Sequence, residues 1–207
     1  MTESALPPGY FDRMYATDDD PWQFTLRWYE RRKRALTMAM LPRARYRAGF
    51  EPGCSIGVLT EELAGRCDRL VSTDVAERAL DSARARLSRS GHASVELRRW
   101  GLGQRWAAEE FDLIVLSEVC YYLDAETLRQ AFDRAVGHLE PGGTLLCAHW
   151  RHVVADYPLT GDEVHAIAHR TAGLAATAHY GDEDVLIDVF AASPPNPPSV
   201  ARLEGLV

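Results

Sequence analysis

The sequence predicts an α/β fold whose core is a doubly wound, mostly parallel sheet of seven strands. Short β runs alternate with helical segments from about residue 47 to about residue 149, a pattern typical of βαβ units with helices on both faces of a parallel sheet. Two more β runs, Leu174–Tyr180 and Val185–Ala191, are separated by Gly181-Asp182-Glu183-Asp184. Because that joint is a hairpin signal, we expect the sheet to end in an antiparallel pair.

The individual elements follow from apolar runs and from capping residues. FDLIVLS, residues 111–117, is a continuous apolar run of the kind found in central parallel strands. Asp124 is expected to cap a helix, and Thr160–Glu163 matches a capping box. The expected strands are 47–51, 70–74, 94–99, 111–117 and 144–149, and the expected helices are 58–66, 76–90, 124–138 and 160–171.

The two ends of the chain differ from the alternating region. Residues 1–21 are polar and turn-rich, whereas residues 23–41 lack glycine and proline and predict a helix ended by Pro42. The sheet does not need residues 1–45, so we expect them to form either a lid over a binding site or a helix packed on the sheet edge. Residues 193–207 are a proline-rich tail that we expect to be loose, which leaves a single domain over residues 1–192.

Composition excludes several classes of function. The 207 residues carry a net charge of −7, whereas a nucleic-acid binder has a basic footprint, and the short block Arg31–Arg34 would point to all sides of a helix. There is no run of about 18 apolar residues and no secretory signal, so we expect a cytoplasmic protein without a membrane partner. The four cysteines lack metal-site spacing, and His165 and His169 lack an HExxH pattern, so no metal is expected.

The first candidate binding element is the turn Glu51-Pro52-Gly53-Cys54-Ser55-Ile56-Gly57. In a doubly wound sheet, ligands bind outside the carboxyl ends of the strands, where the first βα turn lies. Gly53 allows a tight turn close to a ligand, Gly57 allows the next helix to start there, and backbone amides can hold a carboxylate. The spacing G-x-x-x-G lacks the third glycine of a dinucleotide fingerprint, and a P-loop pattern is absent.

The second candidate is Asp74, which ends the second predicted strand 17 residues after Gly57. A carboxylate at this position can accept hydrogen bonds from both hydroxyls of an adenosine ribose. The alternative is a structural role in which Asp74 caps the helix that starts near Ala76.

Taken together, these motifs resemble those of class I S-adenosylmethionine (SAM)-dependent methyltransferases, which have a Rossmann-like fold. The order is Glu51-x-Gly-x-x-x-Gly57, then Asp74, then residues 111–122, then Leu139-Glu140-Pro141-Gly142-Gly143. Within that superfamily, DDPWQFTLRWYERRK, FEPGCSIGVLTEELA and FDLIVLSEVCYYL are similar to segments of the nodulation protein S (NodS) family. Those proteins N-methylate the glucosamine end of deacetylated chitooligosaccharides in nodulating bacteria, and the resemblance covers about residues 10–192.

The resemblance implies SAM as cofactor and assigns residues to it. The methionine part would contact Glu51, Gly53, Cys54, Ser55 and Gly57, while Asp74 would hold the ribose and Val75 would pack under the adenine. The superfamily usually has an acid after the third strand, but this sequence reads Arg99-Trp100-Gly101-Leu102 there. Contacts to the adenine are therefore expected from Trp100, Gly101 and Leu102.

The resemblance also places the chemistry after the fourth strand. Ser117 and Glu118 would lie beside the transferred methyl group, with Tyr121 and Tyr122 forming a wall of the acceptor pocket. Glu118 or a tyrosine could position an acceptor amine or accept its proton. His149, at the end of the fifth strand, is a further candidate base, although a structural role is also open.

The N-terminal segment could close the site as a lid. In that arrangement Trp22, Tyr29, Arg32 or Lys33 would close over the pocket and meet the cofactor carboxylate, and Trp22 and Arg32 are the residues we expect to bind the cofactor.

The expected activity is N-methylation of an amino sugar or oligosaccharide, or of another small molecule, in oligosaccharide biosynthesis for nodulation. Two alternatives stay open, and a third is disfavoured by the sequence. The protein could be an O- or C-methyltransferase acting on another metabolite, or a catalytically silent SAM-binding protein. A nicotinamide dehydrogenase is disfavoured by the missing third glycine and by the closing hairpin.

Overall fold

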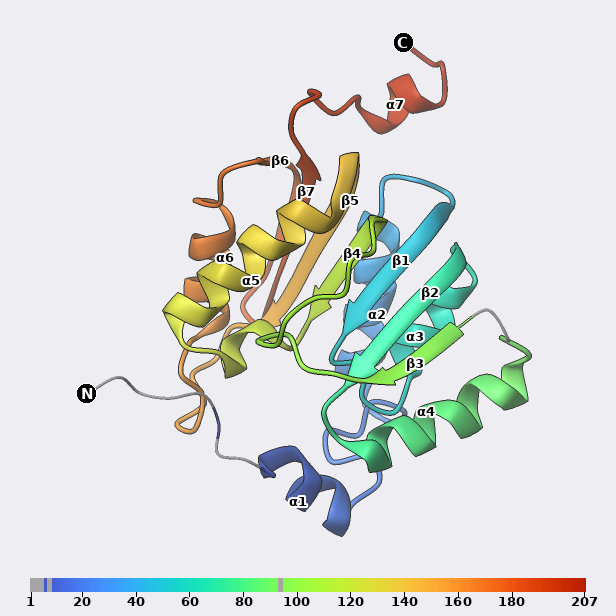
Figure 1. Ribbon diagram of the computed structural model, residues 1–207, viewed down its shortest axis with the longest axis vertical. Helices are drawn as coiled ribbons and strands as arrows, with labels where there is room; N and C mark the ends of the chain where they lie inside the picture. The colour runs from blue at the N-terminus through green and yellow to red at the C-terminus, as the bar shows by residue number, and fades with distance from the viewer. Residues whose placement is uncertain (1–5, 7–8, 93–94) are drawn as a thin grey trace.

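The computed structural model describes residues 6, 9–92 and 95–207, and its centre is a seven-stranded sheet (Figure 1). The strand order is β3-β2-β1-β4-β5-β7-β6. Neighbouring strands are parallel from β3 to β5, whereas β7 runs antiparallel to both β5 and β6. The strands are β1 (Tyr46–Pro52), β2 (Cys67–Asp74), β3 (Val95–Arg99), β4 (Phe111–Ser117), β5 (Leu139–Trp150), β6 (Leu174–Gly181) and β7 (Val185–Ala192). The predicted doubly wound sheet with its antiparallel finish is confirmed.

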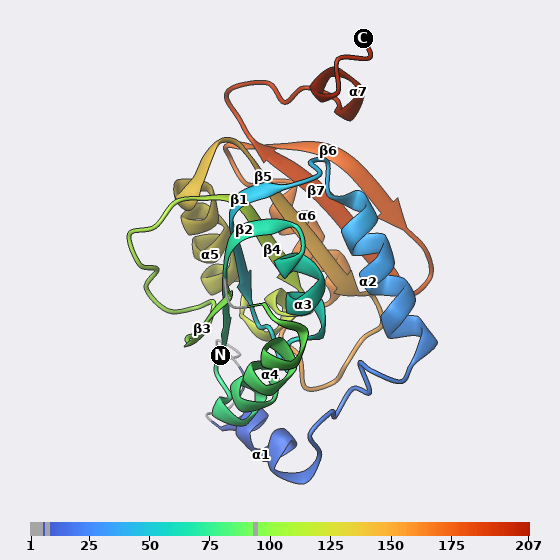
Figure 2. The same ribbon diagram turned by 90° about the vertical axis from the view of Figure 1, so that its right-hand side faces the viewer.

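Helices cover both faces of this sheet, as Figure 2 shows from the side. Helices α2, α3 and α4 lie on one face and α5 and α6 on the other, while α1 lies beyond the carboxyl ends of the parallel strands. The helices are α1 (Tyr10–Thr17), α2 (Trp28–Met40), α3 (Val58–Ala64), α4 (Glu77–Ser90), α5 (Ala125–His138), α6 (Gly161–Ala168) and α7 (Val200–Leu203), with a 3-10 turn η1 at Cys120–Tyr122.

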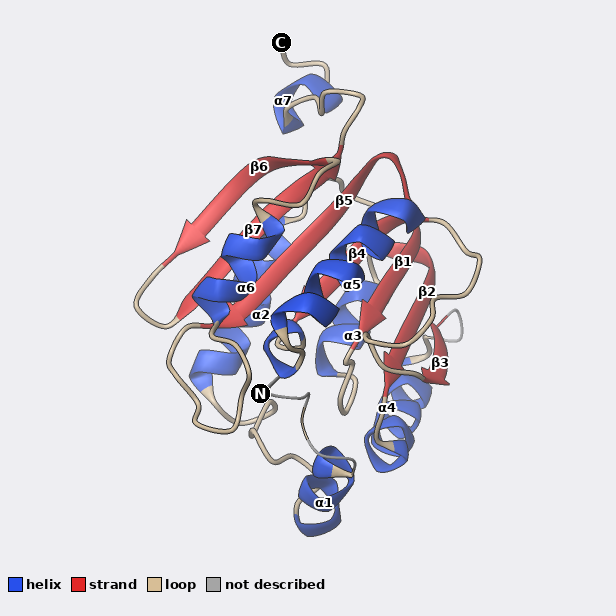
Figure 3. Cartoon of the chain, turned by 60° about the vertical axis from the view of Figure 1, so that its left-hand side comes forward, coloured by secondary structure: helices blue, strands red, loops and turns tan. Residues whose placement is uncertain are grey.

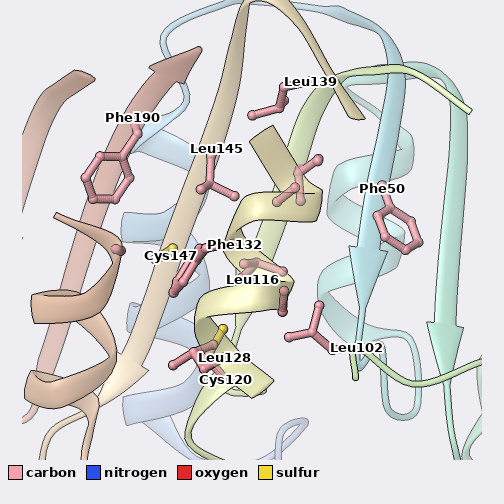
Figure 4. Packing of buried hydrophobic residues seen from close by; sticks show 14 of the residues in the cluster. Phe50, Leu102, Leu116, Cys120, Leu128, Phe132, Leu139, Leu145, Cys147 and Phe190 are labelled. Carbon is pink, nitrogen blue, oxygen red and sulfur yellow. The ribbon is translucent and has the colours of Figure 1, made fainter. Parts of the chain in front are cut away.

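Alternation of side chains along the strands gives each face its own core. Toward α5 and α6, the strands contribute Phe50, Leu116 and Phe190 to a cluster that includes Phe132 of α5 (Figure 4). Toward α2 and α3, Leu113 of β4 and its neighbours pack in a second cluster. Because helices bury both faces, the central strands are apolar almost throughout, as the run FDLIVLS predicts.

The predicted caps form as hydrogen bonds in the structure. Asp124 accepts from the backbone N–H groups of Glu126 and Thr127 at the start of α5. Thr160 and Glu163 complete the reciprocal capping box of α6.

Several elements differ from the expectations. The polar region before residue 21 contains helix α1, which apolar contacts of Tyr15 hold against α4, so composition alone was misleading there. Helix α2 begins at Trp28, five residues after the expected start, because Gln23 has a positive φ of 58° and precedes a turn. Strand β5 extends back through the Pro-Gly-Gly motif, α6 ends at Ala168, and the tail carries the short α7. The predicted strand start at residue 94 lies outside the described residues.

The order of strands reverses between β1 and β4, which lie side by side at the centre of the sheet (Figure 3). The loops that leave these two strands therefore diverge, one toward each face, and open a crevice between them. Among the described residues, no helix is both long enough and apolar enough to cross a membrane.

Candidate functional site

A cavity of about 710 Å³ lies at the carboxyl ends of β1, β2 and β4, at the reversal of strand order. Its floor is formed by the loops after these strands, and its opposite wall by the N-terminal segment from α1 to the first turns of α2. Such a volume is in the usual range for small-molecule sites. Residues of α1 and its linker line the cavity, while α2 packs on the sheet, and closure of the N-terminal segment as a lid stays a prediction.

The loop after β1 is held in an unusual backbone conformation. Gly53 has φ +76°, and a Cβ there would lie 2.9 Å from Val119, so both conformation and space require glycine. Ser55 also has a positive φ, 52°, which is uncommon for a residue with a side chain. Its N–H donates to Asp74 Oδ2 at 2.8 Å, and its hydroxyl shares a 2.5 Å hydrogen bond with Tyr15. Strain of this kind is characteristic of binding sites.

Two carboxylates line the cavity beside this loop. Asp74 is 8% exposed, and its two oxygens accept from the N–H groups of Ser55 and Ala76 at 2.8 and 2.9 Å. Asp74 therefore stabilises the start of α4, which is the structural role that the sequence left open. Each of its oxygens still has a lone pair for a ligand. Glu51 accepts from the hydroxyls of Thr60 and Ser72 through one oxygen. Burial raises the pKa of Glu51 to about 7.

The loop after β4 carries the second strained residue, Glu118, with φ +55°. Lys33 donates to its Oε1 at 2.7 Å, and its Oε2 accepts from the Tyr121 hydroxyl and from the Trp150 N–H at 3.2 Å. Lys33 is itself buried and also pairs with Glu30 at 3.0 Å. The ion pair between Lys33 and Glu118 thus joins helix α2 to the loop after β4.

Aromatic rings complete the wall on the side of the N-terminal segment. Trp22 contacts Phe11, Tyr15 and Phe24, and Phe11 reaches the ring of Tyr122 at 4.9 Å between centroids. This aromatic cluster thus joins α1 and its linker to the loop after β4.

Most of the sequence-predicted residues meet at this one cavity. They come from five separate stretches of the chain, one of which is the loop after β3. The residues that line it are Trp22, Glu51, Gly53, Cys54, Ser55, Asp74, Val75, Trp100, Gly101, Leu102, Ser117, Glu118, Tyr121 and Tyr122.

Three predicted residues, Gly57, Arg32 and His149, are not among the residues that line the cavity. Gly57 does not line the cavity: it has φ +77°, and a Cβ there would lie 2.9 Å from Ala83, so it serves the packing of α4. Arg32 points away from the cavity and donates to Asp182 and Tyr180 on the β6–β7 hairpin.

The third is His149, which is fully buried behind the cavity wall. Its Nδ1 lies 3.1 Å from Nε2 of His165, and its Nε2 accepts from the Cys120 N–H at 3.4 Å. Burial holds the pKa of His149 well below its usual range. It is therefore a neutral structural residue that supports η1, because its ring nitrogens are already used.

The residues of the cavity wall that the sequence did not indicate include Tyr15 and Glu30. Tyr15 lies in a region that looked like a turn, and only its apolar spacing to Phe11 at i, i+4 could have indicated a helix. Glu30 forms an i, i+3 pair with Lys33, which in a sequence is indistinguishable from an ordinary surface pair.

The chain is similar to known proteins in both sequence and structure. The model of the nodulation protein S (NodS) family matches residues 11–164. Nodulation protein S of Rhizobium tropici is 37% identical over 65% of this chain and 60% of its own length, and that of Sinorhizobium fredii 32% over 65% and 66%. The chain thus spans less than two thirds of the length of these two relatives.

Solved structures extend the likeness over more of the chain. The N-methyltransferase NodS of Bradyrhizobium japonicum WM9, in complex with S-adenosyl-L-homocysteine, has a TM-score of 0.78 and 31% identity over 89% of this chain and 96% of its own. A structure from Pseudomonas syringae is 46% identical over 80% of this chain and 99% of its own, with a TM-score of 0.68. S-adenosylhomocysteine is the demethylated product of SAM, which agrees with the cofactor prediction. The chain belongs to the nodulation protein S family and has the fold of SAM-dependent methyltransferases.

Proposed function

We propose that the protein is a SAM-dependent N-methyltransferase that acts on the amino group of an amino sugar or oligosaccharide. The observation that carries the proposal is the single cavity that joins the strained loop after β1 and Asp74 to the carboxylate Glu118. The amino-sugar acceptor rests on the NodS relatives. SAM, when bound, supplies a methyl group on a positively charged sulfur.

The residues of the cavity fit this cofactor. Gly53 and Ser55, both at positive φ, expose the backbone of the loop after β1 to the cavity, which suits close approach of a ligand. Asp74 has free lone pairs for ribose hydroxyls, and Val75, Trp100 and Leu102 offer apolar surface for a base. Glu51, beside the loop, would attract the amino group of the methionine part. These residues would bind and orient the cofactor.

The rest of the cavity would orient the acceptor and exclude water. Tyr121, held by its hydrogen bond to Glu118, and Tyr122, in contact with Phe11, form an aromatic wall of the cavity. Glu118 is held by three donors from three parts of the chain, so its position is fixed before any substrate arrives. Orientation of this kind accounts for much of the rate of an in-line displacement.

A methyl-transfer assay tests the proposal. Purified protein is incubated with SAM carrying a labelled methyl group and either glucosamine or a deacetylated chitooligosaccharide, with the fully N-acetylated sugar as the matched control. We expect label in the free amine and none in the acetylated sugar, since an amide nitrogen is a poor nucleophile. Labelling of the acetylated sugar would indicate O-methylation, and no labelling of any sugar would contradict the proposed acceptor.

A further inference from the structure

Behind the cavity wall, two buried histidines connect a buried carboxylate to the 3-10 turn η1. The carboxylate is Asp188 of β7, and the histidines are His165 of α6 and His149 at the end of β5. Asp188 Oδ2 lies 2.6 Å from His165 Nδ1, and His165 Nε2 lies 3.1 Å from His149 Nδ1. At the other end, the backbone N–H of Cys120 donates to His149 Nε2 at 3.4 Å. These contacts, named the histidine network below, run from the sheet to the turn that carries Tyr121.

The two ends of the histidine network fix the position of every proton in it. A backbone N–H only donates, so His149 Nε2 carries no proton, and the one proton of this neutral ring lies on Nδ1. That N–H donates to His165 Nε2, which leaves the ring proton of His165 on Nδ1, facing Asp188. An ionised carboxylate only accepts. Both ends therefore require the same state, in which the two histidines are neutral and protonated at Nδ1.

Further histidines keep Asp188 ionised at the outer end of the network. Its Oδ1 accepts from His179 Nδ1 at 2.7 Å, and its Oδ2 also accepts from His169 Nε2 at 3.1 Å. Burial alone would raise the pKa of Asp188, but the hydrogen bonds from His165 and His179 outweigh burial and hold that pKa below its usual range. The carboxylate is thus a permanent acceptor for His165.

The inner end of the network lies next to both groups that hold one oxygen of Glu118. Cys120 precedes Tyr121 in the sequence, and His149 precedes Trp150. The Tyr121 hydroxyl and the Trp150 N–H both donate to Glu118 Oε2, the latter at 3.2 Å. The Tyr121 ring also packs edge-on against the His149 ring, with 5.5 Å between the centroids. A displacement of His149 would therefore move both donors and, with them, the carboxylate in the cavity.

We propose that His165 and Asp188 are positioning residues that act through His149 to hold Tyr121 and Glu118 in place at the cavity. The kinetic part of this inference rests on the proposed function, in which that side of the cavity orients the acceptor. Among the described residues, those that line the cavity do not include His149, His165 or Asp188, so the network acts on the site only through its neighbours. A misplacement of about 1 Å caused by a distant change can cost about 100-fold in rate. The loop after β1 makes no hydrogen bond to the network among the described residues, so cofactor binding should not depend on it.

The first test compares methyl transfer to glucosamine by His165→Leu and His165→Gln. Glutamine supplies one acceptor and one donor, as the neutral imidazole does, whereas leucine supplies neither. For His165→Leu we expect kcat/KM for the acceptor to fall about 10-fold to 100-fold, with a smaller loss for His165→Gln, while both variants bind S-adenosylhomocysteine as tightly as wild type. His92→Leu, just beyond the end of α4 and outside the network, is the control. Wild-type kcat/KM in folded His165→Leu would overturn the inference, as would equal losses in both variants with weakened cofactor binding.

The second test needs no acceptor and uses NMR near neutral pH. The imidazole nitrogens of wild type should show His149 and His165 both neutral and protonated at Nδ1, a result that does not depend on whether any variant folds. The ring resonances of Tyr121 should shift in His165→Leu and lie closer to wild type in His165→Gln. A proton on Nε2 of either histidine, or unchanged Tyr121 resonances in folded His165→Leu, would overturn the inference. If wild type binds S-adenosylhomocysteine but methylates no amine, the proposed function fails and the NMR result alone decides whether the network positions Tyr121.

Discussion

The two halves of the cavity are built in different ways. The half that we propose for the cofactor, called the cofactor half, consists of the loop after β1 and the end of β2, within 24 residues of chain from Glu51 to Asp74, and is fixed largely by backbone conformation. The half that we propose for the acceptor, called the acceptor half, joins α2 to the loop after β4 through side chains, and its central contact, Lys33 to Glu118, spans 85 residues. We therefore expect the cofactor half to keep its structure when the acceptor half is changed. In the acceptor half, loss of the Lys33 charge should break the contacts between α2 and the loop after β4.

The largest effect that tests this difference is expected from Lys33→Met. The change leaves Glu30 and Glu118 as neighbouring buried carboxylates without their shared cation, and breaking a buried pair costs about 3–5 kcal/mol. We expect a lower free energy of unfolding in urea and a large loss of turnover. Arg32→Met is the matched control, since Arg32 pairs with Asp182 outside the cavity.

For Lys33→Met and Arg32→Met, calorimetric titration with S-adenosylhomocysteine gives the affinity that is compared with turnover. Lys33→Met should lose far more turnover than affinity for S-adenosylhomocysteine, whereas Arg32→Met should retain both. If Lys33→Met loses cofactor affinity in proportion to turnover, the two halves are not independent.

A smaller effect is expected in the cofactor half as pH changes. Burial raises the pKa of Glu51 to about 7, so its ionised form, which would bind the methionine amino group, dominates only above that pH. We expect affinity for S-adenosylhomocysteine to rise about tenfold from pH 6 to pH 8. Titration of Glu51→Gln should give a flat profile over the same range.

The same shift affects stability with a definite sign. The carboxyl group of Glu51 binds a proton more tightly in the folded state than in the unfolded state, because its folded pKa lies above the ordinary value of 4.5. Its contribution is therefore fully present below about pH 4.5 and is lost as pH rises through about 7. In urea unfolding, the free energy of unfolding of wild type relative to that of Glu51→Gln should be higher at pH 5 than at pH 8. The same relative value at both pH values would contradict the raised pKa.

The smallest effect is expected from Tyr15→Phe, which removes the hydroxyl that holds Ser55. One neutral hydrogen bond contributes about 0.5–1.5 kcal/mol, so affinity for S-adenosylhomocysteine should fall about threefold to tenfold. Thr17→Val is the control on the same helix, because that hydroxyl bonds only to the Met14 carbonyl among the described residues. Equal affinity of Tyr15→Phe and wild type would show that α1 covers the cavity without stabilising its loop.

The sequence predicted the sheet, and it indicated the residues that we propose for the cofactor, because the signals of both are local. The apolar run 111–117 lies within one strand, and the glycine spacing and the acid at a strand end lie within one β-α-β unit, so the sequence pattern and the cavity lining coincide at Gly53 and Asp74. Helix α1 was missed because its few apolar residues bury against α4, a contact that composition does not reveal.

The residues of the acceptor half could not be predicted from the sequence in the same way. Arg32 and Lys33 are neighbours in sequence, but successive helix residues point about 100° apart, so one reaches the β6–β7 hairpin and the other the cavity. His149 ends a strand at the correct edge of the sheet, yet it points toward α6, where His165 holds it. Which face a side chain takes depends on packing between distant segments.

The central claim is that this cavity binds the SAM skeleton through Asp74. Calorimetric titration of S-adenosylhomocysteine into wild type should give one site per chain, and Asp74→Ala should bind about 100-fold more weakly, because each charged hydrogen bond to a ribose hydroxyl contributes about 1.5–3 kcal/mol. Asp81→Ala, an exposed change on α4, should bind as wild type does. Absence of heat with folded wild type, or equal binding by folded Asp74→Ala, would contradict the claim.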